Sequence, residues 1–147
     1  MGKILEVLQN SIFSHLCYTH IMSNEELTKY WFSSARQDWE TTQALLKSHR
    51  YMHALFFCHL TLEKTLKGII TQKKGMPPIT HDLLLLAEKA KIELNTEQAQ
   101  LLSDVNAFNI RARYDDYKNS FYKRATASYA KKYIKEVNKF KIWLKKR

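Results

Sequence analysis

The chain has 147 residues, of which 45% are hydrophobic, 26% charged and 12% aromatic. A chain of this length and composition suits one compact globular domain. Glycine occurs three times and proline twice. This is too seldom to supply the turns of a many-stranded sheet, so long helices are expected.

Positive charge is concentrated in the C-terminal quarter of the chain. Residues 1–110 carry equal numbers of basic and acidic side chains, whereas residues 111–147 carry 13 lysines and arginines against three carboxylates. The last segment therefore accounts for the whole formal net charge of +10. Such segregation indicates an anionic partner, which can be nucleic acid, a nucleotide or an acidic protein, or else a lysine-coated solvent face.

We interpret residues 1–22 as an accessory extension and residues 23–147 as the domain. Ser23 and Glu26 have the spacing of a capping box, which predicts that a new helix starts there. Polar residues interrupt the extension, so neither a signal peptide nor a membrane span is expected. An amphipathic helix is predicted within it by Ile4, Leu5, Leu8, Ile12 and Leu16.

Apolar residues at three-to-four spacing predict the remaining helices. Gly75 is expected to end the second of them, before an extended linker held by two prolines. Thr80 is expected to cap a short third helix, and residues 115–123 to form a loop. The fold class is therefore all-α, an up-and-down bundle of four or five helices. The expected helices cover residues 24–47, 51–73, 81–87, 96–109 and 126–145.

The cysteines and histidines predict no metal site and no cofactor. Cys17 and Cys58 form no CxxC motif, and Cys58 lies in an apolar helical run, which predicts a buried, reduced thiol and fits the cytoplasm. His49 and His53 have helical i, i+4 spacing but straddle a predicted helix junction, and no second cluster converges on them.

Four short motifs follow one another between about residues 22 and 145. They are Tyr30-Trp31-Phe32-Ser33-Ser34-Ala35-Arg36-Gln37-Asp38-Trp39, Tyr51-x-x-Ala54-x-x-Phe57 leading into Leu62-Glu63-Lys64-x-x-Lys67, Pro78-Ile79-Thr80-His81-Asp82-Leu83, and Arg113-Tyr114-Asp115. In this order they resemble the two opening helices, the Pro-x-Thr-His-Asp-Leu linker and the pre-terminal segment of the HEPN domain family.

The resemblance implies a helical bundle that pairs as a symmetric homodimer. It also implies binding of a nucleotide or RNA and partnership with a minimal nucleotidyltransferase, often in a toxin–antitoxin module. Many members of the family are metal-independent RNases. These use an arginine followed, after four to six residues, by a histidine at the dimer seam.

The chain departs from that RNase motif. The corresponding positions are Asp116, Tyr117 and Lys118 counted from Arg111, and Lys118, Asn119 and Ser120 counted from Arg113, and no histidine follows His81. RNA cleavage requires a group that moves the 2′-hydroxyl proton, and histidine does so near neutrality because its reference pKa is about 6.5. Tyrosine, with a reference pKa near 10, is a poor base at pH 7.

We therefore expect a non-catalytic binding protein. Two alternatives stay open: an RNase toxin with a variant site at Arg111 and Tyr117, and a purely protein-binding component.

Arg111 and Arg113 are the expected phosphate clamp, because guanidinium groups bind phosphate through two hydrogen bonds. Tyr117 is expected to stack on a base. The alternative is an Arg–Asp network that anchors the loop. His81 is expected in the first turn of a helix, where backbone N–H groups favour anions; the alternative is a side chain that packs and caps locally. The supporting ligand residues are Lys118, Lys123 and Arg124.

Asp38 and Glu63 are expected to be structural. Both lie on helical segments with apolar neighbours, and a buried carboxylate must be paired. The arginines of residues 111–113 are the predicted partners.

Overall fold

The computed structural model describes residues 22–147, and within them every regular element is a helix. The all-α, up-and-down bundle predicted from the sequence is confirmed. The predicted helix within residues 1–22 lies almost entirely outside the described residues. The helices are α2 (Asn24–Lys47), α3 (Tyr51–Gln72), α4 (Leu83–Lys89), α5 (Thr96–Arg111), α6 (Ser120–Arg124) and α7 (Ala127–Leu144).

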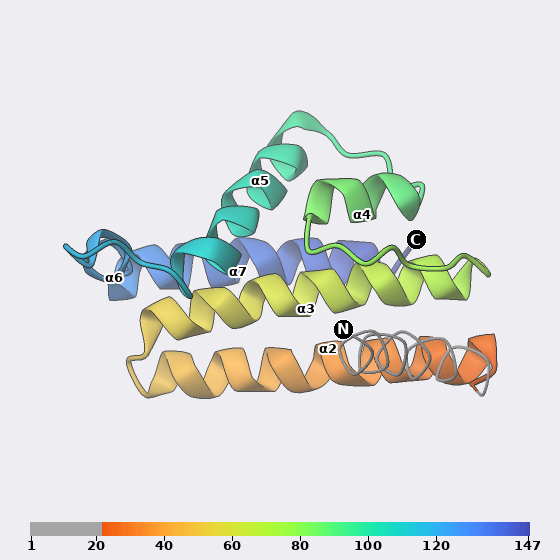
Figure 1. Ribbon diagram of the computed structural model, residues 1–147, viewed down its shortest axis with the longest axis horizontal. Coiled ribbons are helices and arrows are strands. Elements are labelled where there is room, and N and C mark those ends of the chain that lie inside the picture. The colour runs from red at the N-terminus through yellow and green to blue at the C-terminus, as the bar shows by residue number, and fades with distance from the viewer. Residues whose placement is uncertain (1–21) are drawn as a thin grey trace, which may run out of the picture.

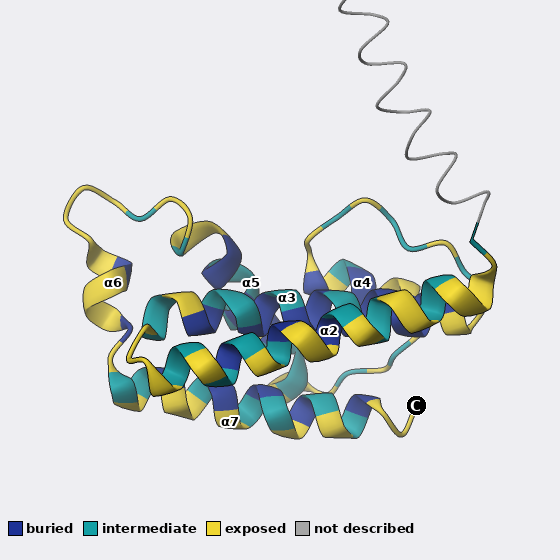
Figure 2. Ribbon diagram, turned by 90° about the horizontal axis from the view of Figure 1, so that it is seen from below, coloured by how far each residue is buried: buried dark blue, intermediate teal, exposed yellow. Residues whose placement is uncertain are grey.

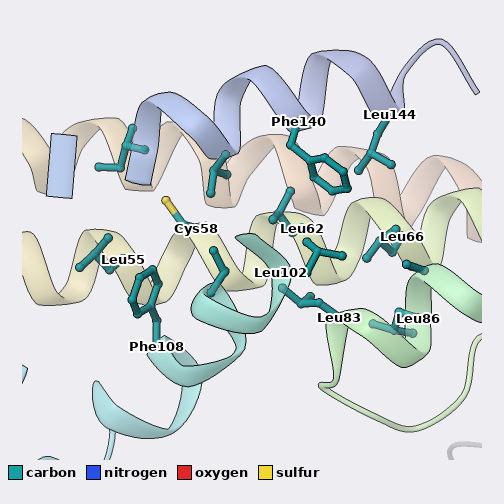
Figure 3. Close-up of a cluster of buried hydrophobic side chains, with 14 of the residues drawn as sticks. Leu55, Cys58, Leu62, Leu66, Leu83, Leu86, Leu102, Phe108, Phe140 and Leu144 are labelled. Atoms are coloured by element: carbon teal, nitrogen blue, oxygen red, sulfur yellow. The ribbon is translucent and has the colours of Figure 1, made fainter. Parts of the chain in front are cut away.

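Helix α3 is the centre of the bundle. It runs antiparallel beside α2, and it also contacts α4, α5, α6 and α7 (Figure 1). Leu62 of α3 faces Phe140 of α7, and leucines of α4 and α5 cover another side of α3 (Figure 3). Because α3 is covered on several sides, it carries buried polar side chains as well as apolar ones. None of the described helices is both long enough and apolar enough to cross a bilayer.

The predicted bounds of α2 are confirmed, and its first turn shows why. The Ser23 hydroxyl accepts a hydrogen bond from the Glu26 N–H (3.1 Å), and the Glu26 carboxylate accepts one from the Ser23 N–H (2.8 Å). Farther along, α2 approaches α3 closely at Gly68, where an added Cβ would lie 2.8 Å from the Phe32 ring. Gly68 therefore permits the tight packing of the two helices.

The end of α3 differs from the prediction. Lys74, not Gly75, adopts the left-handed conformation, with φ of 60°. The Gly75 N–H donates to the Ile70 carbonyl at 2.9 Å, as in a Schellman motif. Glycine is needed at position 75 for this close approach, because a Cβ there would lie 3.0 Å from the same carbonyl oxygen.

The cap of α4 was also predicted wrongly. Asp82, not Thr80, caps the helix: its carboxylate accepts hydrogen bonds from the N–H groups of Leu84 (2.9 Å) and Leu85 (3.4 Å). The hydroxyl of Thr80 instead accepts from the N–H of Asp82 at 3.2 Å. His81 consequently precedes the helix and is not in its first turn.

Part of the loop predicted at residues 115–123 is the short helix α6. A helix of this length is too short to be stable by itself. Phe121 holds it in place, because this side chain is buried and stacks on Phe108 of α5 with ring centroids 5.7 Å apart. This long-range contact is the reason that local sequence patterns did not predict α6.

Lys91 ends α4 in a left-handed conformation, with φ of 55°. For a residue with a Cβ this conformation costs about 1–2 kcal/mol, and a glycine would not have this cost. Glycine also has a larger conformational entropy in the unfolded chain, which offsets part of the stabilisation. We expect Lys91→Gly to raise the free energy of unfolding by about 0.5–1 kcal/mol, measured by urea denaturation. Lys89→Gly, at the last residue of the helix and with an ordinary helical backbone, is the control and should lower it by up to about 1 kcal/mol.

The boundary of the domain at residue 23 stays a prediction. We expect a chain that begins at Met22 to unfold at the same temperature as the full chain, because the capping box at Ser23 starts α2 without help from the preceding residues. Thermal unfolding of the two proteins, followed by circular dichroism, is the measurement. A much lower Tm for the shorter chain would place the extension in the core.

Candidate functional site

Two arginines meet at a surface cleft of about 310 Å³ where α5 ends and α6 lies. Arg111 is the last residue of α5 and Arg124 is the last of α6. Helix C-termini stabilise positive charge, so both guanidinium groups are well placed electrostatically. The cleft is lined by Arg111, Tyr114, Asp115, Asp116, Ser120, Phe121 and Arg124.

The two aspartates of the cleft bind backbone N–H groups. Asp115 accepts from the N–H groups of Phe121 (3.0 Å) and Tyr122 (2.9 Å), and Asp116 from those of Lys118 and Ser120 (both 3.0 Å). Desolvation raises the pKa of Asp115, but these hydrogen bonds outweigh it and hold the pKa below its ordinary value. Hydrogen bonds from Ser120 lower the pKa of Asp116 in the same way. Both carboxylates therefore stay ionised and order the loop before α6.

Neither arginine of the cleft is neutralised by an ion pair. Among residues 22–147, Arg111 and Arg124 form no salt bridge, so the alternative of an Arg–Asp network is not what the structure shows there. The charges of the lining residues themselves balance, two arginines against two aspartates. Lys118 and Lys123 are close to the cleft in sequence and are exposed without lining it.

Only part of the predicted ligand set converges on the cleft. Tyr117 is 89% exposed and lies outside it, with the Lys118 amine 5.5 Å from its ring centroid. Arg113 is also outside: its Nε donates to the Asn109 carbonyl at 2.9 Å, and its guanidinium lies over the Tyr114 ring. Lys123 is exposed without lining the cleft. Tyr114, which lies beside the two arginines in the sequence but was not chosen as a ligand residue, is the tyrosine that lines it.

His81 belongs to a different cluster, centred on Glu63 of α3. The Nδ1 atom of His81 lies 3.0 Å from one carboxylate oxygen of Glu63, and the Lys67 amine donates to the other at 2.8 Å. The Nε2 of the buried His59 ring donates a hydrogen bond to the His81 carbonyl at 2.8 Å. These contacts fasten the linker before α4 to the central helix. His81 was predicted to lie in the first turn of a helix, but Asp82 is the N-cap and α4 begins at Leu83.

Burial and pairing act in opposite directions on the charges of this cluster. Desolvation raises the pKa of Glu63, but the hydrogen bonds from Lys67 and His81 outweigh it and lower the pKa. Desolvation is the main cause that lowers the pKa of His59, and the nearby Arg113 guanidinium adds to it. Glu63 is thus ionised and His59 neutral at pH 7.

The predicted partners of the two buried carboxylates were wrong. Asp38 of α2 pairs with Lys64 of α3, with the amine 2.6 Å from a carboxylate oxygen, and Glu63 pairs within α3 and with His81. The reason is geometric: Asp38 faces α3 across the α2–α3 interface, whereas residues 111–113 lie at the far end of α5. No group of three possible metal ligands occurs within residues 22–147.

The lysines of α7 form an exposed stripe. They lie on the side of the helix opposite Ile134, Val137 and Phe140, which are buried against the core. Exposed residues run along the outer side of α7 and around α6 (Figure 2). Only Lys139 has a carboxylate partner within the described part of the chain, Glu136 at 2.9 Å. The stripe consists of Lys131, Lys132, Lys135 and Lys139 on α7 and of Lys146, which follows the helix.

These features define a small helical-bundle domain with an arginine-lined cleft at one end and a lysine stripe along its last helix. The chain belongs to the HEPN domain family, whose model matches residues 28–147. A crystal structure of TT1696 from Thermus thermophilus shares the fold, with a TM-score of 0.70 and 15% sequence identity over 81% of this chain and 96% of that one. No curated protein matches the chain.

Proposed function

We propose that this HEPN domain is a binding module that holds the phosphate groups of a nucleotide or RNA without cutting them. The observation that carries the proposal is the convergence of Arg111 and Arg124 on one cleft with no salt bridge to any described carboxylate. Guanidinium groups bind phosphate oxygens through paired, charge-assisted hydrogen bonds. The ring of Tyr114 is 74% exposed beside them and is available to stack on a base.

The lysine stripe favours RNA over a free nucleotide as the ligand. Helix α7 leads away from the cleft, so a strand anchored there can continue along Lys131 and Lys135 (Figure 1). If five lysines contact single-stranded phosphates, log affinity falls with log salt at a slope of about −3.5. This corresponds to about a hundredfold loss between about 50 and 200 mM salt.

The direct test is isothermal titration of ATP, GTP and a short single-stranded RNA at low salt, repeated with the RNA at rising salt. We expect the RNA to bind with the slope given above and Arg111→Ala to weaken it. Absence of heat with all three ligands would contradict the proposal. Tight binding with a flat salt response would leave the stripe as a solubilising surface.

The partners implied by the family are part of the proposal: a second copy of this chain in a symmetric homodimer, and a minimal nucleotidyltransferase in a toxin–antitoxin-like module. Analytical ultracentrifugation tests the first, and a pull-down after co-expression with a minimal nucleotidyltransferase tests the second. A salt-sensitive pull-down by a protein that shows no RNA affinity would instead support the purely protein-binding alternative.

RNA cleavage is the second candidate function, and one observation favours it. The side chain of His81 is 64% exposed while its Nδ1 is held by the buried Glu63 carboxylate, and Nε2 has no hydrogen-bond partner among residues 22–147. A carboxylate that orients an imidazole in this way is typical of general bases. Tyr117, which together with Arg111 forms the variant RNase site considered from the sequence, lies outside the cleft.

Incubation of RNA with pure protein in EDTA separates binding from cleavage. We expect no cleavage. Cleavage that is lost in His81→Ala and retained in Tyr117→Phe would establish the second function with His81 as base. Cleavage that is lost in both Arg111→Ala and Tyr117→Phe would establish a site built on Arg111 and Tyr117.

A further inference from the structure

A second and larger hollow lies at the other end of the bundle. It is a groove of about 880 Å³ between the N-terminal half of α2, the C-terminal half of α3 and the C-terminal end of α7. The arginine cleft lies at the opposite end of α7, so the two are separate (Figure 1). Helix α7 has 18 residues and is therefore about 27 Å long.

The charged side chains that line the groove are all positive. Lys29 and Arg36 come from α2, and no aspartate or glutamate lines it. Only Lys29 has a carboxylate partner in the described part of the chain, Glu25 at 3.1 Å. Like charges gathered without counter-charges repel one another, and this cost is relieved when an anion binds. The other four cations of the lining are Lys141, Lys145, Lys146 and Arg147.

Lys141 is held inside the groove and is not extended into solvent. Its amine lies 3.7 Å from the centroid of the Trp39 ring, a cation–π contact between α7 and α2. Desolvation, and then the neighbouring Lys145, lower the pKa of Lys141 to about 8. On the α3 side it faces Cys58, whose pKa burial raises to about 12, so the thiol is neutral and offers no counter-charge. The α2 side contributes only the cations Lys29 and Arg36.

The remaining lining is largely apolar. Phe32, Ile69 and Leu144 form part of it, and Phe32 is fixed by its close contact with Gly68. Grooves and pockets that bind small molecules commonly measure about 300–1,000 Å³ and combine apolar walls with a few placed polar groups. The groove has that size and that composition.

We propose that this groove is a second anion-binding site, which takes an organic phosphate with an apolar body and at least two negative charges. The phosphate lies against Lys141, Arg36 and Lys145, and the body of the ligand covers Phe32, which is only partly buried. The same chemistry is available from a free small molecule or from the 5′-phosphorylated end of an RNA. The site does not depend on Arg111 and Arg124.

The fluorescence of Trp39 reports on this site directly. We expect ADP to change the tryptophan emission at low salt and to bind at least tenfold more tightly than inorganic pyrophosphate, which lacks an apolar body. Lys141→Met should weaken ADP binding at least tenfold, because it removes a partly desolvated charge. Lys47→Met, an exposed lysine of α2 outside both sites, is the matched control and should bind as the unchanged protein does. The chain has three tryptophans, Trp31, Trp39 and Trp143, and an emission change that is kept in Trp31→Phe and in Trp143→Phe would assign the signal to Trp39.

The double variant Arg111→Ala/Arg124→Ala distinguishes this site from the proposed function. It should keep the Trp39 signal even if it loses RNA binding. A 5′-phosphorylated RNA that competes with ADP more strongly than the 5′-hydroxyl RNA would identify the RNA end as the source, and equal weak competition would identify a free small molecule. The proposal is overturned if neither ADP nor pyrophosphate changes the emission, if the double variant abolishes the change, or if ultracentrifugation shows a dimer that Lys141→Met dissociates.

Discussion

Replacing Glu63 with alanine is expected to lower the free energy of unfolding by about 3–5 kcal/mol, the usual cost of removing one partner from a buried ion pair. Glu63 is 5% exposed and accepts a hydrogen bond from the Lys67 amine at 2.8 Å. Without the carboxylate, the charge of Lys67, itself 8% exposed, would stay buried with no counter-charge. Urea denaturation followed by circular dichroism gives the measurement.

The matched controls separate the lost pair from the lost side chain. Glu136→Ala removes a glutamate from an exposed pair with Lys139 and should cost less than about 1 kcal/mol. The double variant Glu63→Ala/Lys67→Met should recover much of the stability, because a methionine in place of the orphaned lysine needs no counter-charge. Equal destabilisation by the single and the double variant would contradict this account.

Acid should destabilise the fold through the same cluster. The folded-state pKa of Glu63 is below its ordinary value of 4.5, so its contribution is fully present above that value and is lost as the pH falls through the folded pKa. The pKa of His59 is also lowered, from 6.5, so the unfolded chain binds this proton first and stability starts to fall below about pH 6.5. We expect the free energy of unfolding, measured by urea denaturation, to fall steadily from pH 7 to pH 4.

The second large effect is expected on ligand binding. Arg111→Ala should weaken RNA binding roughly ten- to hundredfold, because a hydrogen bond to a charged group contributes about 1.5–3 kcal/mol. Arg124→Ala should have a similar effect, and the double variant should retain only the salt-dependent binding by the lysine stripe. Isothermal titration at low salt, with circular dichroism to verify folding, measures these losses.

Arg113→Ala is the informative comparison. Arg113 is two residues from Arg111, and the sequence made the two arginines equal candidates for the phosphate clamp. In the structure the Arg113 Nε donates to the Asn109 carbonyl, and the side chain lies outside the cleft. We expect this variant to keep most of the affinity of the unchanged protein. A loss of RNA affinity as large as that caused by Arg111→Ala would show that the ligand contacts Arg113 as well, and that the cleft does not define the binding site.

The helices could be predicted because their signals are local. The capping box at Ser23 and the spacing of the apolar residues gave both ends of α2, and the segregation of charge pointed to residues 111–147. Helix α6 could not be predicted in this way, since so short a helix holds its shape only because Phe121 packs on Phe108. The motif order also indicated the HEPN family, which the match over residues 28–147 shows.

Which charged side chains meet could not be predicted from the chain. Asp38 pairs with Lys64, Arg111 shares a cleft with Arg124, and the Lys141 amine rests on Trp39. Helical periodicity is set by hydrogen bonds between residues four apart, so it can be read from short windows. Contacts between side chains on different helices depend on how whole faces pack around α3, and that arrangement exists only in the folded molecule.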